Sequence, residues 1–455
     1  MENQHSSRPA NSRTFPLQWS ALLSREFWIT FFTYLLFAAS TFTISGVELS
    51  VMFLYLLTAY HFLRGPVPMG IPKWLAAPFI LWILVAVGSA LANPEPAATL
   101  LSLRHQYRIL LPFALLLALR HVELERLLKV YLAFACVAAV YALFQTAFAV
   151  DLMRPQGRII FDEVAGFGIN GVIYRARGNF AGTNAFGFLM MATSLMFAGL
   201  AGARLPRGRR TWLFGALLSA GGLLASVSRA AWLGALVGLL VLAMRLPRRW
   251  AAAIASAALA LAILAIIVMN SNWAEEELRF LAQIPLIGRL AGMHISNDSA
   301  QVRFVLWDAS IRGIKEKPLL GAGFMNRGAM LKNLRPPERL RAIFPIRASG
   351  DDTHNIFLQV TYYFGLLGLG AFLSMWAAVI AWNLRCIKIA NGRFPLETGV
   401  LWGSSAVFAA ALIDGLFHDN FFGAVANFTI MICMGLSFFA GLRIHEQIAS
   451  HRSAG

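Results

Sequence analysis

The stretch 351–382, DDTHNIFLQVTYYFGLLGLGAFLSMWAAVIAW, passes from acidic residues into an apolar segment that carries no charge. About 20 apolar residues suffice for a helix to cross a lipid bilayer. His354 and Asn355 stand at the boundary, and Gly365 and Gly368 complete the pattern H-N-x9-G-x-x-G. A neutral imidazole can accept a proton, and the positive end of a helix dipole disfavours protonation of the ring. His354 is therefore the first candidate for chemistry.

The composition extends this membrane assignment to the whole chain. Of 455 residues, 58% are hydrophobic and only 13% are charged, against about 25% in a globular protein. We predict an all-α polytopic membrane protein with about twelve transmembrane helices. Apolar windows of spanning length lie near 28–45, 47–63, 74–92, 105–120, 128–150, 180–202, 211–227, 230–244, 250–269, 354–382, 398–416 and 421–442.

The net charge of +17 is distributed in short segments between the apolar windows, which argues against a nucleic-acid partner. The basic segments fall on alternating loops, so the positive-inside rule predicts that both termini are cytoplasmic. The predicted organisation is a cytoplasmic N-terminus (1–27), nine transmembrane helices (28–269), a long outer loop (270–353), three transmembrane helices (354–442) and a cytoplasmic C-terminus (443–455).

The long outer loop has helical periodicity of its own. Apolar residues between Glu275 and Leu290 predict an amphipathic helix on the membrane surface, and the segment 300–314 predicts a second helix. The segment Pro318-Leu-Leu-Gly-Ala-Gly323 predicts the turn that follows it. The two acidic residues 351–352 are read as helix-capping residues, because no further ligand pattern accompanies them. We predict neither a metal ion nor another cofactor.

Arginines on the outer side oppose the insertion bias and are therefore informative. Arg303 lies four residues before Trp307 and so on the same helical face. Guanidinium groups fork onto phosphate oxygens, but an isolated arginine also reaches lipid phosphate or pairs with acids such as Asp151, Asp162 or Glu163. Grouped with His354, the pair Arg229 and Arg303 favours binding of a diphosphate. The other outer candidates are Arg104, Arg108, Arg175 and Arg177, with Asn184 at a glycine-rich helix entrance.

Asp414 is a carboxylate inside an apolar window, followed by His418, Asp419 and Asn420. Acids within membrane helices are usually functional or paired. Asp414 is therefore either a proton-relay group or a structural partner, and a structural role is favoured.

The pattern His354-Asn355-x9-Gly365-x-x-Gly368 resembles the signature of the O-antigen ligase/polymerase superfamily, and of bacterial O-antigen ligases in particular. Ser228-Arg229-Ala-Ala-Trp-Leu233 is similar to that family's arginine–leucine element. Arg303-x3-Trp307 and the turn 318–323 resemble the stretch before the family's histidine. The motif-bearing part covers about 175–370.

This resemblance implies a fold of the C type of membrane glycosyltransferases with a periplasmic active site in the bacterial inner membrane. It implies transfer of a glycan from undecaprenyl diphosphate to a sugar hydroxyl of lipid A-core, without a metal ion. In this hypothesis His354 activates the acceptor hydroxyl, and Arg229 and Arg303 hold the diphosphate. Direct attack by the acceptor would invert the anomeric centre. Asn355, Asn184 and the other outer arginines are candidate substrate contacts.

Three other functions compete with ligation. An O-antigen polymerase would use a second lipid-linked chain as acceptor, and a protein O-glycosyltransferase would use a protein hydroxyl. A transporter of lipid-linked oligosaccharides belongs to a different class and should show broken helices in two related halves. The polar residues here concentrate at one face and in one outer loop, which favours an enzyme.

Overall fold

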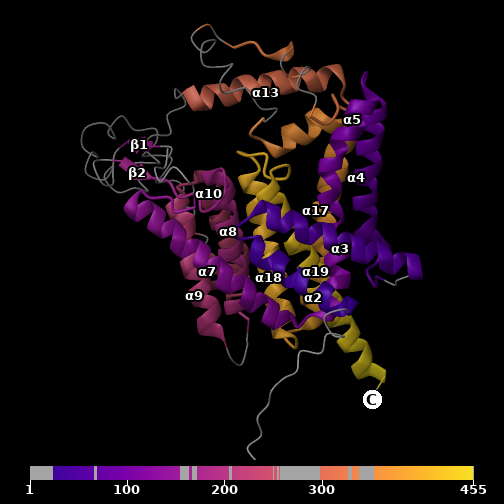
Figure 1. Cartoon of the computed structure of the whole chain (residues 1–455), viewed down its shortest axis with the longest axis vertical. Coiled ribbons are helices and arrows are strands. Elements are labelled where there is room, and N and C mark those ends of the chain that lie inside the picture. The colour runs from indigo at the N-terminus through magenta and orange to yellow at the C-terminus, as the bar shows by residue number, and fades with distance from the viewer. Residues whose placement is uncertain are drawn as a thin grey trace, which may run out of the picture.

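The protein is described by a computed structural model in which helices account for almost every element (Figure 1). The structure describes residues 24–65, 69–153, 163–165, 172–203, 208–249, 251–253, 256, 298–325, 330, 332–336, 338 and 353–453. The helices of the first half are α2 (Arg25–Ala39), α3 (Ile44–Arg64), α4 (Lys73–Leu91), α5 (Pro96–Ser102), the 3-10 helix η1 (Leu103–Leu110), α6 (Leu111–Ala118), the 3-10 turn η2 (Leu119–His121) and α7 (Leu124–Phe148).

A small hairpin divides the two halves of the chain. Its strands β1 (Glu163–Ala165) and β2 (Val172–Tyr174) pair antiparallel. The helices that follow are α8 (Thr183–Ala201), α9 (Arg209–Ser226), α10 (Arg229–Ala243), α13 (Asp298–Glu316), α17 (Ile356–Ala390), α18 (Pro395–Asp414) and α19 (Ala424–Ser453).

The polytopic all-α prediction is confirmed for the described part of the chain. Seven of its helices are long and apolar enough to cross a membrane, namely α3, α4, α7, α8, α17, α18 and α19, and α10 is a shorter apolar helix. The predicted helix at 105–120 is not one continuous helix, because the structure divides this window between the short 3-10 helix η1 and the short helix α6. Most of the window 250–269 and the predicted helix Glu275–Leu290 lie outside the described residues. The count of twelve therefore stays a prediction.

The bundle centres on α8 and α19, whose apolar surfaces are covered by other helices. Small residues permit the closest approach, because a Cβ added to Gly199 of α8 would collide with the backbone of Gly403 in α18. Such small-residue contacts stabilise helix pairs where lipid provides no hydrophobic drive between them. This contact fixes α8 and α18 to each other near the C-terminal end of α8.

The basic loops and the outer-loop helix lie at opposite ends of the bundle. In Figure 1 the C-terminus lies at the bottom, whereas α13 and the β1–β2 hairpin lie at the top. Polar contacts join neighbouring helices at the lower end: Arg25 Nη1 of α2 hydrogen-bonds to His61 Nδ1 of α3 at 3.0 Å, and Arg443 of α19 pairs with Glu397 of α18 at 3.4 Å.

Helix α17 is broken at Gly365, which has φ 68° and ψ −169°. A side chain there would collide with the carbonyl of Leu319, so both the left-handed backbone and the close approach require glycine. The turn 318–323 docks against the break through four backbone hydrogen bonds: Leu366 N to Pro318 O (2.8 Å), Leu367 N to Leu319 O (3.3 Å), Ala322 N to Tyr362 O (2.8 Å) and Gly323 N to Tyr363 O (3.0 Å). The break thus exchanges hydrogen bonds within α17 for hydrogen bonds to the segment that follows α13.

Polar groups at the end of α4 complete this junction. The Ser89 hydroxyl donates to the carbonyls of Leu320 (2.6 Å) and Tyr363 (3.0 Å), and the Asn93 amide donates to Ala322 O. Buried carbonyls freed by a helix break need such donors. The junction fixes the C-terminal end of α13 to α17. It therefore determines how the side chains of the two helices lie relative to each other.

Candidate functional site

His354 occupies a tight turn immediately before α17. Its backbone has φ 51°, a left-handed conformation that is uncommon for a residue with a side chain. Asn355 caps the helix, because its side-chain oxygen accepts hydrogen bonds from the amides of Phe357 (3.0 Å) and Leu358 (3.1 Å). Outliers of this kind cost energy and persist only when the surroundings enforce them. The turn must therefore be held by its neighbours.

Thr353, which precedes His354 and is fully buried, provides that hold. Its amide donates to the side-chain oxygen of Gln359 at 2.6 Å, and its carbonyl accepts from Trp307 Nε1 at 2.9 Å. Gln359 belongs to α17 and Trp307 to α13, so both helices clamp the peptide beside His354. The predicted helix 300–314 is confirmed within α13, and its tryptophan faces the histidine turn.

The charge environment of His354 favours the neutral ring. Burial, and after it the charge of Arg303, lower the pKa of His354 from 6.5 to about 4. Asp419 acts in the opposite direction, and His418 lowers the pKa slightly further. Desolvation and a nearby like charge both disfavour an imidazolium. At neutral pH the ring is uncharged, and one of its nitrogens can accept a proton.

The end of α18 adjoins the same turn, which the sequence did not indicate. The amide of Ile356 donates to Gly415 O at 2.7 Å, and Asn355 Nδ2 donates to Leu416 O at 3.2 Å. Pairing of this kind depends on how α17 and α18 pack, and no local motif encodes it. The contact brings the connection between α18 and α19 beside His354.

Asp414, at the end of α18, has partners of its own. It is 1% exposed, and its two oxygens lie 3.1 Å from His418 Nδ1 and 3.1 Å from Asn420 Nδ2. Asn420 also donates to Ala411 O at 2.7 Å. The carboxylate thus ties together the chain that turns from α18 to α19, as a structural partner would. It also orients the imidazole of His418, which is close enough to influence His354.

Arg229 is the first residue of α10 and is carried to the same end by helix packing. Helices α10 and α18 run antiparallel, since Gly234 lies against Ala410 and Gly238 against Ala406. Continuing that register to the start of α10 places Arg229 at the level of Gly415. Arg229, Arg303 and His354 are therefore brought to one end of the bundle by three different helices.

Arg175 and Asn184 contact each other and the segment that leads into α10. Arg175 Nη2 donates to Asn184 Oδ1 at 3.3 Å, and its Nε donates to Ser226 O at 3.3 Å. The hydroxyl of Ser228, the residue before Arg229, also donates to Asn184 Oδ1 at 3.3 Å. Arg175 and Asn184, two predicted substrate contacts, thus hold the backbone and side chain that directly precede Arg229.

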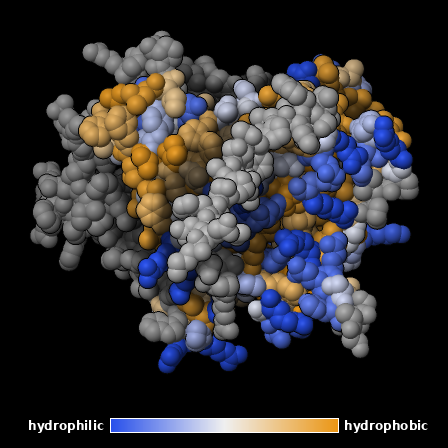
Figure 2. Space-filling model, turned by 60° about the horizontal axis from the view of Figure 1, so that its bottom comes forward, coloured by the Kyte–Doolittle hydropathy of each residue, from blue (hydrophilic) through white to orange (hydrophobic). Residues whose placement is uncertain are grey.

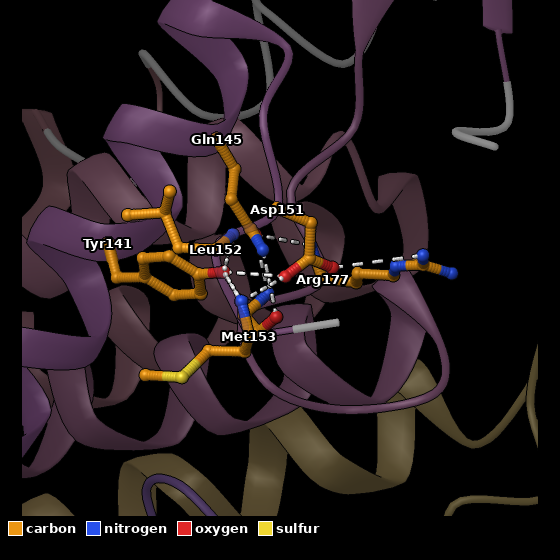
Figure 3. A network of polar contacts seen from close by, with 7 residues as sticks. Tyr141, Gln145, Asp151, Leu152, Met153 and Arg177 are labelled. Atoms are coloured by element: carbon orange, nitrogen blue, oxygen red, sulfur yellow. Dashed lines mark hydrogen bonds and ion pairs between the residues drawn. The ribbon is translucent and has the colours of Figure 1, made fainter. Parts of the chain in front are cut away.

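Arg177 lies in a separate polar network, shown in Figure 3. Its guanidinium is 3.8 Å from Asp151, a carboxylate that is 2% exposed and accepts a hydrogen bond from Tyr141 at 2.6 Å. The side-chain oxygen of Gln145 accepts hydrogen bonds from the backbone amides of Arg177 (3.3 Å) and Gly178 (2.9 Å). Pairing with Asp151, the structural alternative for the outer arginines, is realised at this position.

Arg108 and Arg104 lie in η1. Arg108 pairs with Glu48 at 3.4 Å, and its guanidinium stacks 4.7 Å from the ring of Phe428. These contacts attach η1 to α3 and α19 and give Arg108 a structural role in the bundle. Arg104 is exposed on the same 3-10 helix.

No group of three or more His, Cys, Asp and Glu side chains suited to a metal ion occurs among the described residues. Asp351 and Asp352 lie outside them. Metal independence accordingly stays a prediction.

Comparison with known protein families finds a match over part of the chain. Residues 214–373 match the family model described as O-Antigen ligase. The matched region contains Arg229, Arg303 and His354 together with the junction at Gly365. Arg175, Asn184 and the Asp414–His418 pair lie outside it. No curated protein matches the chain.

Proposed function

Because the chain belongs to the O-antigen ligase superfamily, whose activity is that of a membrane glycosyltransferase, we propose that it is an O-antigen ligase. The donor is a glycan on undecaprenyl diphosphate, and the acceptor is a sugar hydroxyl of lipid A-core. The observation that carries the proposal is the position of His354 directly before a membrane-spanning helix, where burial and the charge of Arg303 lower the pKa of its ring. That position suits a substrate whose lipid lies in the bilayer and whose head group lies in water.

In this mechanism His354 accepts the proton of the acceptor hydroxyl. The lowered pKa keeps the ring neutral, and the clamp on Thr353 fixes its direction. The oxygen then attacks the anomeric carbon from the side opposite the diphosphate, so the configuration inverts. The sugar–phosphate bond breaks with the diphosphate as leaving group, and its charge grows as the bond lengthens.

Arg229 and Arg303 offset that growing charge. Guanidinium groups fixed in advance by packed helices need no reorganisation when the charge develops. Asn355 and the corner formed by Arg175 and Asn184 are proposed to bind the glycan or the phosphates nearby. Arg104, Arg108 and Arg177 are more distant candidates, and the partners of the last two favour a structural role.

The proposed orientation places the active site in the periplasm and both termini in the cytoplasm of a bacterial inner membrane. In this arrangement helices lie in 28–269 and 354–442, with the outer loop 270–353 between them. The concentration of basic residues at the end opposite α13 supports it. A reporter protein that is active only in the cytoplasm should be active when it is fused after the last residue, and a reporter that is active only in the periplasm should be inactive there.

Deletion of the gene in its host tests the proposal directly. Lipopolysaccharide is separated on a gel, and undecaprenyl-diphosphate-linked glycan is measured in parallel. Loss of all O-antigen bands with polymer retained on the carrier supports ligation. Lipid A-core bearing a single repeat would instead indicate a polymerase, and an unchanged pattern would remove lipopolysaccharide as the product.

A further inference from the structure

A hollow of about 210 Å³ lies at the end of the bundle opposite His354, between α2, α3 and the turn η2. One part of its wall is apolar, formed by residues such as Ile29, Leu54 and Leu117. The other part carries nitrogen donors from His61, Arg120 and His121, together with the hydroxyl of Thr58. A wall that is apolar on one side and basic on the other suits a ligand of the same two-part character.

The basic part of the hollow is organised by hydrogen bonds. Arg25 Nη1 donates to His61 Nδ1 at 3.0 Å, so the remaining ring nitrogen, Nε2, carries the hydrogen and is a donor. The backbone of His121 is held by Thr30, whose hydroxyl donates to His121 O at 3.3 Å. Arg120 reaches Met69 O at 3.3 Å and brings a guanidinium to the wall itself, whereas Arg25 acts from behind His61.

The local charge favours an anion. Arg25 and Arg120 contribute two positive charges, and Glu26 is the acid whose charge reaches His121. Arginine recognises phosphate oxygens through paired N–H groups, and neutral imidazoles add single donors. Phosphate is therefore the chemistry that the polar side of the hollow would recognise.

The surroundings favour a lipid as the source of that phosphate. The hollow adjoins α3, a helix long and apolar enough to cross a membrane, so a lipid bound at this end of α3 would have its acyl chains in the bilayer. Figure 2, which brings the lower end of Figure 1 forward, shows hydrophilic residues surrounding apolar ones on this face. Basic pockets between membrane helices are known to receive acidic lipid head groups.

We propose that this hollow binds the head group of an anionic phospholipid, with the acyl chains along α3. The site lies at the opposite end from the glycosyl-transfer residues, so the proposal does not depend on the proposed function. The bound lipid would contact α2, α3 and η2, the elements that line the hollow.

Native mass spectrometry of the purified full-length protein tests the proposal. The probes are phosphatidylglycerol and, as a zwitterionic control, phosphatidylcholine. Wild-type protein should retain phosphatidylglycerol preferentially, and Arg120→Gln should reduce retention about fivefold, as expected for one arginine near acidic head groups. Arg64→Gln is the matched control, because it removes the same charge from the end of α3 but outside the wall of the hollow. It should change retention less than about twofold.

A second variant protects the test against misfolding. The double change His61→Asn and His121→Asn keeps small polar side chains and should also reduce retention, while gel filtration shows an unchanged monodisperse protein. Equal retention of both lipids, or equal losses in Arg120→Gln and Arg64→Gln, would overturn head-group recognition. Thermal stabilisation by inorganic phosphate equal to that by the lipid would instead assign the hollow to a soluble anion and contradict the lipid assignment.

Discussion

Two polar clusters at the outer end of the bundle each contain an arginine, and their partners differ. The first corner is the cluster around Arg177, and the second corner is the cluster around Arg303 and His354. Arg177 faces the buried carboxylate of Asp151, which is itself held by the hydroxyl of Tyr141. Arg303 lies beside the imidazole of His354, and its charge helps to keep that ring neutral. Pairing with a buried carboxylate ties the Arg177 guanidinium to the fold, whereas the charge of Arg303 acts on a group that could accept a proton. We therefore expect the first corner to support stability and the second to take part in the proposed chemistry.

The largest effect is expected at the histidine of the second corner. His354→Ala should reduce glycan transfer by about a thousandfold, within the range of general-base catalysis, because no other group replaces the proton acceptor. Transfer is measured with purified donor and acceptor in detergent or vesicles. His105→Ala is the control, since His105 is exposed on η1 at the same end of the bundle. Wild-type activity in His354→Ala protein that still inserts normally would contradict the assignment.

Exchanging the two arginines for lysine separates the corners directly. Arg303→Lys should reduce transfer by about a hundredfold, because an ammonium cannot reproduce the forked contact with a diphosphate. Arg177→Lys should keep transfer within about threefold of the wild type, because lysine still offers Asp151 a positive charge. Both variants are compared by kcat and KM for the lipid-linked donor. Equal losses at the two positions would erase the functional distinction between the corners.

The sequence predicted that Arg303 and His354 belong to one site, and the structure brings them together, while their function stays a prediction. Apolar windows located the helices, and the spacing of Arg303 and Trp307 predicted a shared helical face. It did not predict that the end of α18 meets the histidine turn, because the hydrogen bond from Ile356 to Gly415 depends on packing between distant segments. For the same reason, the contact between the turn 318–323 and the helix break at Gly365 could not be predicted from the sequence.

Gln359 illustrates the same limit at a single residue. In the sequence it is an isolated polar residue within an apolar helix, which is compatible with many roles. The structure gives its side-chain oxygen a defined task, accepting the amide of Thr353 at 2.6 Å next to the left-handed His354. Gln359 is thus a positioning residue for the proposed base.

Replacing Gln359 tests whether the clamp maintains the corner. Gln359→Leu should reduce kcat by about tenfold, because small displacements of a catalytic group are costly. It should also change the pH profile. The wild-type ring, with a pKa of about 4, stays neutral from pH 7 to 5, and activity is lost only as the pH falls through 4. A loosened, more hydrated ring would have a pKa nearer 6.5, so the loss of activity would begin near pH 7.

The groups around His354 make this profile interpretable. Arg303 faces the ring from α13, and His418 and Asp419 face it from the connection after α18. Thr361→Val is the control, because its hydroxyl bonds only the carbonyl of Phe357 within α17 among the contacts that the structure describes. A slower Gln359→Leu enzyme with the wild-type pH profile would show that Gln359 supports the helix without setting the environment of His354.

The smallest effect on transfer is expected from the first corner. Asp151→Asn removes the charge that Arg177 faces, but it keeps an oxygen that can accept from Tyr141. The buried network should lose about 2 kcal/mol of stability, the typical cost of leaving a buried polar group poorly matched, while transfer stays within about twofold. Thermal unfolding in detergent and transfer at low temperature measure the two effects separately. Tyr141→Phe removes the hydrogen bonds of the Tyr141 hydroxyl to Asp151, Leu152 and Met153 without changing charge, and a larger loss of stability in Asp151→Asn would point to the ion pair with Arg177. If Asp151→Asn instead slowed transfer at unchanged stability, the first corner would belong to the active site, and the contrast between the two arginines would reflect their positions along the substrate.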